Sequence, residues 1–142
     1  MTPDIRVALI AEVERLAAPL PVFDLTEYVS IDDLPMNDVG EALLIDFVTS
    51  SETMSSIGGF GNQGWEQVGS SVIHWLYPAG DPSYPILVKG EALRNELKGR
   101  RLPGTPKAMV TSAEPFLSLG EPVNGGWASV VSNIFIVSNS CG

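Results

Sequence analysis

The stretch of sequence that decides the fold is residues 124–141, NGGWASVVSNIFIVSNSC. Its Asn-Gly-Gly opening is a turn signal, and the apolar residues after it alternate in the manner of a long β-strand. One face of the strand carries Trp127, Val131, Phe135 and Val137, and the other carries Ala128, Val130, Ile134 and Ile136. Because large apolar groups occur on both faces, we expect the strand to be covered on both. The stretch therefore predicts a compact structural module.

Upstream of this strand, the spacing of apolar residues predicts two helices. The first spans residues 3–17, where Ile5, Leu9 and Val13 recur at helical spacing behind a proline start. The second spans residues 84–98. Its expected buried stripe is Ile86, Gly90, Leu93 and Leu97, with Ser83 placed to cap its start and Gly99 to end it.

Further strands are expected at residues 22–29, 42–49, 65–77 and 108–113, with a second short piece at 116–119 and a turn over 121–126. Residues 50–64 contain small polar residues and four glycines, which predicts a long flexible loop. The order of elements predicts an α+β fold in a single domain, 1–142. We expect four or five antiparallel or mixed strands with two helices packed on one face.

Length and composition exclude several classes of protein. The 142 residues include a single cysteine, Cys141, so an internal disulfide is impossible. No run of about 18 apolar residues is present, and the N-terminus lacks the pattern of a signal peptide. We expect a soluble, cytoplasmically made protein with no membrane partner. Charged residues make up only 18% of the chain, which favours a surface partly covered by other proteins.

The net charge of −9 is unevenly distributed. Residues 1–88 contain two basic and thirteen acidic residues, a net charge of −11, and residues 89–142 contain six basic and four acidic residues, a net charge of +2. An acidic chain is a poor binder of free DNA, because phosphate contacts need a basic surface. The asymmetry suits a protein that stacks acidic surface against basic surface, although ordinary solubility explains it equally well.

Residue types that carry chemistry are sparse. The one histidine, His74, lies mid-strand, and neither Ser56 nor Cys141 is placed to form a nucleophile with it. Asp32 and Asp33 could hold a cation, but adjacent acids are more often a solvated turn. We therefore expect no enzyme activity, no cofactor and no metal site. A small hydrolase or metal-binding enzyme stays open as the weaker alternative.

The chain resembles the tail terminator family of long-tailed phages, of the lambda type, in its first helix and from residue 64 onward. Four pieces carry the likeness: the helix 3–17, the strand and turn VIHWLYPAG at 72–80, the helix containing Leu93 and Leu97, and GWASVVSNIFI at 126–136. The most specific parts are the strand that breaks at Pro78 and Gly80 before a helix, and the tryptophan that opens the last strand. Residues 20–60 match poorly.

The resemblance implies a ring of six copies that caps the tail tube of a virion, stops tube polymerisation and offers a docking surface to head-completion or neck proteins. DNA would pass through the channel, and assembly would take place in the host cytoplasm. The alternative within the same class is another neck or tail component, such as a head-closure protein or a tube subunit.

Two sets of residues are candidates for the interfaces of such an assembly. The loop 50–63, with its apolar Met54, Ile57 and Phe60, is expected to be flexible alone and to pack against a neighbouring subunit or the tube. The basic residues Lys98, Arg100 and Arg101 are expected to oppose acids from the first half of the chain across a subunit or tube interface. Their rival role is contact with DNA in the channel.

Overall fold

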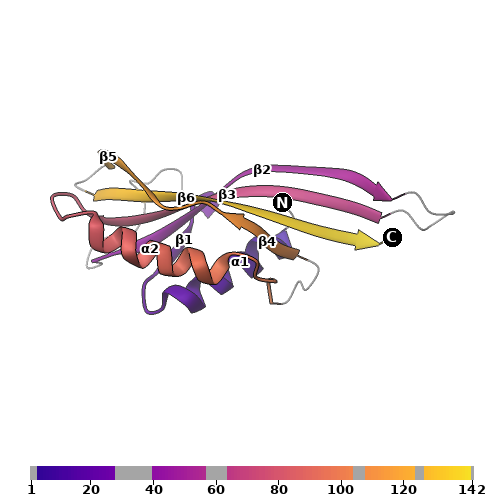
Figure 1. Cartoon of the computed structure of the whole chain (residues 1–142), viewed down its shortest axis with the longest axis horizontal. Coiled ribbons are helices and arrows are strands. Elements are labelled where there is room, and N and C mark those ends of the chain that lie inside the picture. The colour runs from indigo at the N-terminus through magenta and orange to yellow at the C-terminus, as the bar shows by residue number, and fades with distance from the viewer. Residues whose placement is uncertain (1–2, 28–39, 57–63, 104–107, 124–126, 142) are drawn as a thin grey trace.

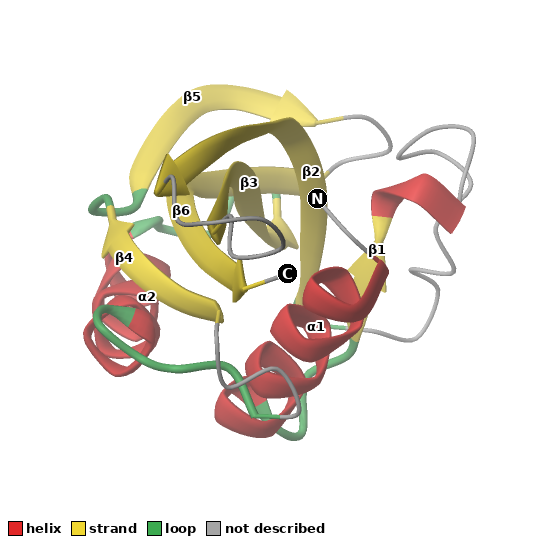
Figure 2. Ribbon diagram, turned by 90° about the vertical axis from the view of Figure 1, so that its right-hand side faces the viewer, coloured by secondary structure: helices red, strands yellow, loops and turns green. Residues whose placement is uncertain are grey.

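The computed structural model describes residues 3–27, 40–56, 64–103, 108–123 and 127–141 (Figure 1). In chain order the elements are α1 (Pro3–Ala17), β1 (Val22–Asp24), the short 3-10 helix η1 (Leu25–Glu27), β2 (Ala42–Ser56), β3 (Gly64–Pro78), α2 (Tyr84–Leu97), β4 (Ala108–Ala113), β5 (Leu117–Val123) and β6 (Trp127–Cys141). Both helices lie on the same side of one twisted sheet (Figures 1 and 2). The α+β class predicted from the sequence is confirmed.

The sheet is larger than expected, with six strands in place of four or five. Its order is β1-β2-β3-β6-β4, and β5 also pairs with β6. All neighbours are antiparallel except β1 and β2, which are parallel over three residues. The 15-residue β6 has room for two partners along one edge, since β5 pairs with its residues 127–131 and β4 with residues 134–138.

The main core lies between the helices and the sheet. Leu9 and Val13 of α1 and Leu97 of α2 are fully buried against the inward-facing residues of the strands. All four residues of the stripe expected on α2 are buried. Gly99, just after the end of the helix, has a φ of 79°, a conformation that favours glycine. Ser83 does occupy the position before α2, but its hydroxyl makes no capping hydrogen bond. Neither helix is long and apolar enough to cross a membrane.

The expectation that β6 is covered on both faces is wrong over most of its length. Val130, Ile134 and Ile136 are buried under the helices, whereas Phe135 and Val137 on the other face are only half-buried. A second small core exists on that other face near the start of β6. There Ala42, Leu44 and Leu76 pack beneath Phe23, Leu25 and Trp127.

The expected flexible loop at 50–64 is also wrong for most of its residues. Residues 50–56 continue β2 and residue 64 begins β3, so that the two strands form one long antiparallel hairpin with pairs such as Ser51↔Val68 and Thr53↔Glu66. Small polar residues look like a loop in the sequence, yet a backbone ladder satisfies their amide groups without any apolar pattern. Residues 57–63, including Ile57 and Phe60, lie outside the described residues.

Two strand boundaries differ from those predicted. The strand expected at 22–29 ends at Asp24, because the chain turns into η1. The piece expected at 116–119 begins at Leu117 and continues to Val123. Pro122 is accommodated there because its pairing partner Ala128 lies on only one side of β5, and an edge strand tolerates a missing N–H group.

Candidate assembly surfaces

The first candidate surface is the distal arm, which we define as residues 51–56 of β2, 64–68 of β3 and 137–141 of β6. These ends of the three longest strands extend past the helices (Figure 1). The outer edge of β2 pairs with β1 only at residues 43–45, so within the described residues the edge from Asp46 to Ser56 has no strand beside it. Such an edge presents unpaired N–H and C=O groups to solvent or to another chain. The backbone of Met54 lies on this edge, paired on the inner side with Trp65.

The second candidate is the helix-free face, the side of the sheet opposite α1 and α2. Cross-strand partners in an antiparallel sheet share a face, so Val68, Val137 and Met109 form one apolar row and Val131 and Leu117 a second. Leu117 is 64% exposed and Val68 is 37% exposed, while the other three side chains are half-buried. Neither α1 nor α2 covers these apolar side chains, and Leu25 of η1 packs on the small cluster Ala42, Leu44 and Leu76 elsewhere on the same face.

His74 lies in the second row, paired across the sheet with Val131 and Leu44. Burial lowers the pKa of its imidazole below the ordinary 6.5, and the negative charge of Asp46 only partly opposes this effect. Neutral His74 is therefore the form that the fold favours. The described residues contain no group of three or more histidine, cysteine, aspartate or glutamate side chains able to hold a metal ion. Asp32 and Asp33 lie outside the described residues.

The basic cluster Lys98, Arg100 and Arg101 follows α2 and is held rigidly by β4. Gly99 N–H donates to the Val110 carbonyl, Val110 N–H to the Arg100 carbonyl, and Leu102 N–H to the Ala108 carbonyl. The three side chains nevertheless differ. Lys98 and Arg101 are exposed, whereas the guanidinium of Arg100 donates to Glu12 Oε1 at 3.1 Å and to Glu96 Oε2 at 3.0 Å within the same chain.

Glu12 of α1 is buried although it lies largely off the stripe formed by Ile5, Leu9 and Val13. The residue is only 3% exposed. Its carboxylate is paired with Arg15 on α1 and with Arg100 beyond α2. The hydrogen bond and charge of Glu12 raise the pKa of Arg15. Two guanidinium groups make the burial of one carboxylate tolerable, because a buried charge needs compensating partners. Arg100 thus pairs with an acidic residue from the first half of the chain, but this pair lies within one subunit and not across the expected interface.

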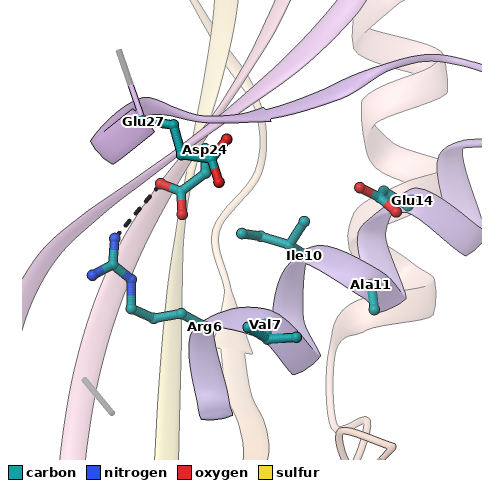
Figure 3. A pocket seen from close by; sticks show the side chains of 7 residues that line it. All are labelled: Arg6, Val7, Ile10, Ala11, Glu14, Asp24 and Glu27. Atoms are coloured by element: carbon teal, nitrogen blue, oxygen red, sulfur yellow. Dashed lines mark ion pairs between the residues drawn. The ribbon is translucent and has the colours of Figure 1, made fainter. Parts of the chain in front are cut away.

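A groove between α1 and the β1–η1 segment is the surface that sequence reasoning missed (Figure 3). It has a volume of about 410 Å³ and is lined by Arg6, Val7, Ile10, Ala11, Glu14, Asp24 and Glu27. Arg6 pairs with Asp24 at 3.6 Å and also lies 4.6 Å from the centre of the Phe47 ring. Glu14 and Glu27 have no ion-pair partner within the described residues. Val7 is 67% exposed at the edge of the groove.

One sequence signal could have pointed to this groove. Val7 and Ile10 lie off the stripe formed by Ile5, Leu9 and Val13, which leaves apolar side chains beside the polar flank of α1. Nothing local, however, relates Glu14 to Asp24 and Glu27, since β1 takes its place through parallel pairing with β2, far along the chain.

A second hollow, of about 380 Å³, lies near the start of α2 and includes Glu41, Tyr77 and Lys89 among its lining residues. The carboxylate of Glu41 accepts hydrogen bonds from Trp75 Nε1 at 2.9 Å and from Lys89 Nζ at 3.0 and 3.1 Å. Glu41 thereby joins β3 to α2 through hydrogen bonds to Trp75 and Lys89.

Comparison with known proteins adds no assignment to these surfaces: no family model matches the chain, and no curated protein matches it.

Proposed function

We propose that this chain is a structural, non-enzymatic virion protein that forms a ring, of six copies, on the end of a phage tail tube. In this role it stops tube polymerisation and presents a surface to head-completion or neck proteins, while DNA passes through the channel. The site of action is the tail or neck of the virion, after assembly in the host cytoplasm. No cofactor, metal or membrane takes part.

The observation that carries the proposal is the distal arm with its open β2 edge. Ten or more residues of unpaired strand edge are a liability in a monomer, because such edges pair with other chains. The edge from Asp46 to Ser56 is long and adjoins a helix-free apolar face. A ring puts both features to use, since each subunit contacts a neighbour through one surface and the tube or neck through another.

The test is to determine the size of the purified protein by analytical ultracentrifugation at micromolar concentration, followed by electron microscopy of the protein alone and mixed with tail tubes. We expect closed rings, and rings at the ends of tubes that no longer elongate. A protein that stays monomeric alone and leaves tubes free to grow would refute the proposal.

Other tail components remain the alternative within the same class. A tube subunit would add along the tube and lengthen it, whereas a head-closure protein would bind heads or necks and leave tube length unchanged. An enzyme would depend on His74 or on the groove carboxylates. Replacement of His74 by glutamine should therefore leave ring assembly intact, and loss of a measurable hydrolytic activity in that variant would favour the enzyme.

A further inference from the structure

We propose that the acidic groove of one copy receives the basic turn of the next copy, residues 98–101, in a head-to-tail contact. The inference rests on the proposed ring function and names the surfaces through which copies join. It follows from the charges of the two surfaces, from the apolar floor between the acids, and from their positions on opposite sides of α1.

The groove has the chemistry to bind a long basic side chain. Its lining holds three carboxylates and one guanidinium, a net charge of −2. Arg6 offsets Asp24 through their 3.6 Å ion pair, which leaves Glu14 and Glu27 as the charges available on the two sides of the groove. Between them lies the apolar side chain of Ile10, with the exposed Val7 and Ala11 at the edge of the groove. An apolar floor with acidic rims suits a lysine or arginine, whose stem is apolar and whose head is charged.

The basic turn is shaped to enter such a groove. Three backbone hydrogen bonds fix residues 99–102 along β4, so the turn needs little ordering on binding. Lys98 is exposed, and its ammonium group has no partner within the described residues. Arg101 is exposed beside it. Arg100 does not take part, because Glu12 and Glu96 of its own chain hold its guanidinium group.

The two surfaces cannot meet within one copy. The carboxylate of Glu12 points to Arg100 on the α2 side of α1, while Glu14 points into the groove on the β1 side. Two residues of a helix advance by about 200°, so these side chains leave α1 on nearly opposite flanks. Complementary patches on opposite flanks produce a heterologous contact, which closes into a ring when the rotation between copies permits.

A charge-swap experiment tests this contact. The turn variant carries Lys98→Glu and Arg101→Glu, and the groove variant carries Glu14→Lys and Glu27→Lys. Each should associate at least about tenfold more weakly than the parent protein, because like charges would then face each other. An equimolar mixture should recover association, because the unchanged groove of the turn variant fits the unchanged turn of the groove variant, and the two altered surfaces again carry opposite charges. Copies of the two variants can therefore alternate through both contacts. Sedimentation velocity at low and high salt measures all three samples.

Two controls make the outcome decisive. Circular dichroism with thermal melting establishes that each variant is folded, and the variant Tyr84→Glu with Val88→Glu, exposed at the start of α2, adds negative charge at the end of the helix far from the basic turn. That control should associate as the parent does. Turn and groove variants that assemble normally would overturn the inference while leaving the ring proposal intact, as would a mixture that fails to recover. A parent protein that never assembles, alone or on tubes, would overturn both.

Discussion

The two ends of the same three strands are stabilised in different ways. In the body of the molecule Ile45, Ile73 and Ile134 are completely buried between sheet and helices. In the distal arm the strands read SETMSS, GWEQV and VSNSC, and their pairing rests on a ladder of backbone hydrogen bonds. The body is thus held by apolar burial, and the arm has a backbone edge on β2 that a further strand could extend. The comparison separates the part of the chain that folds the subunit from the part available for other chains.

The largest loss of stability is expected when a buried side chain of the body is shortened. Ile134→Ala removes a fully buried side chain of β6 and should lower the free energy of unfolding by about 2–5 kcal/mol, through lost burial and the cavity left behind. Val131→Ala, three residues away on the helix-free face, should cost about 1 kcal/mol or less, because Val131 is only half-buried. Urea denaturation of both variants gives the comparison. Equal losses would mean that the helix-free face is covered in the folded subunit.

Hydrogen exchange examines the arm directly. In the unassembled subunit, amides of residues 52–54 should exchange at least about 100-fold faster than those of residues 43–45. Among the described residues, 43–45 are fully buried and have a strand on both sides, whereas 52–54 have a strand only on the β3 side. Mass spectrometry of peptides from β2 measures both segments at once. Assembly should slow exchange in the arm. Equal protection of the two segments in a monomer would refute the division of β2 into body and arm.

The ion pairs of Glu12 with Arg15 and Arg100 connect the basic cluster to the body of the molecule. Arg100→Gln leaves a carboxylate whose side chain is 2% exposed with Arg15 as its remaining cation, and we expect a loss of about 1–3 kcal/mol in the free energy of unfolding. Lys98→Gln is the matched control and should change stability by less than about 0.5 kcal/mol, because Lys98 lies on the surface and its ammonium group has no partner within the described residues. Charge reversal at Arg100 would face Glu12 with a second carboxylate and is unsuitable for testing assembly. An unchanged melting temperature for Arg100→Gln would contradict the role given to Glu12.

Gly90 provides a smaller test of the body. A Cβ at this position would lie 2.7 Å from Phe116 Cδ2, so alanine must displace the aromatic ring. The displacement costs about 1–3 kcal/mol, against a helix-propensity gain of about 1 kcal/mol. We expect Gly90→Ala to destabilise the protein by about 1 kcal/mol, whereas Asn95→Ala on the exposed side of α2 should stabilise it slightly. A more stable Gly90→Ala protein would show that Phe116 moves without cost.

The smallest effect concerns pH and the helix-free face. The pKa of His74 is lowered on folding, so the unfolded chain binds this proton more readily. The stability that comes from neutral His74 in the folded state is fully present above pH 6.5. It is lost as the pH falls from 6.5 towards the folded-state pKa, because the unfolded chain is protonated first. We expect a loss of less than about 1 kcal/mol between about pH 7.5 and 5.5. His74→Gln should remove this part of the pH dependence in urea titrations. An identical slope in the variant would assign the effect to other groups.

The sequence predicts those parts of the fold in which local pattern and tertiary burial agree. The stripes of α1 and α2 and the bounds of β4 are of this kind, because one face of each element meets the core. In the arm, the strands at residues 65–68 and 137–141 were predicted, but residues 50–56 were missed because they are mostly small and polar, and their extended form comes from pairing with β3. The acidic groove could not be predicted either. Its rims come from α1 and from residues after β1, and only the packing of the two brings Glu14 near Asp24 and Glu27.

The position of β6 also sets an order of events during synthesis. This strand lies between β3 on one edge and β4 and β5 on the other, and it pairs with all three. Until residues 127–141 have left the ribosome, β3 has one neighbour instead of two, and α2 lacks much of the surface that it covers. Contacts of such long sequence separation form slowly. The nascent chain is therefore exposed to premature edge pairing until β6 inserts between β3 and the pair β4 and β5.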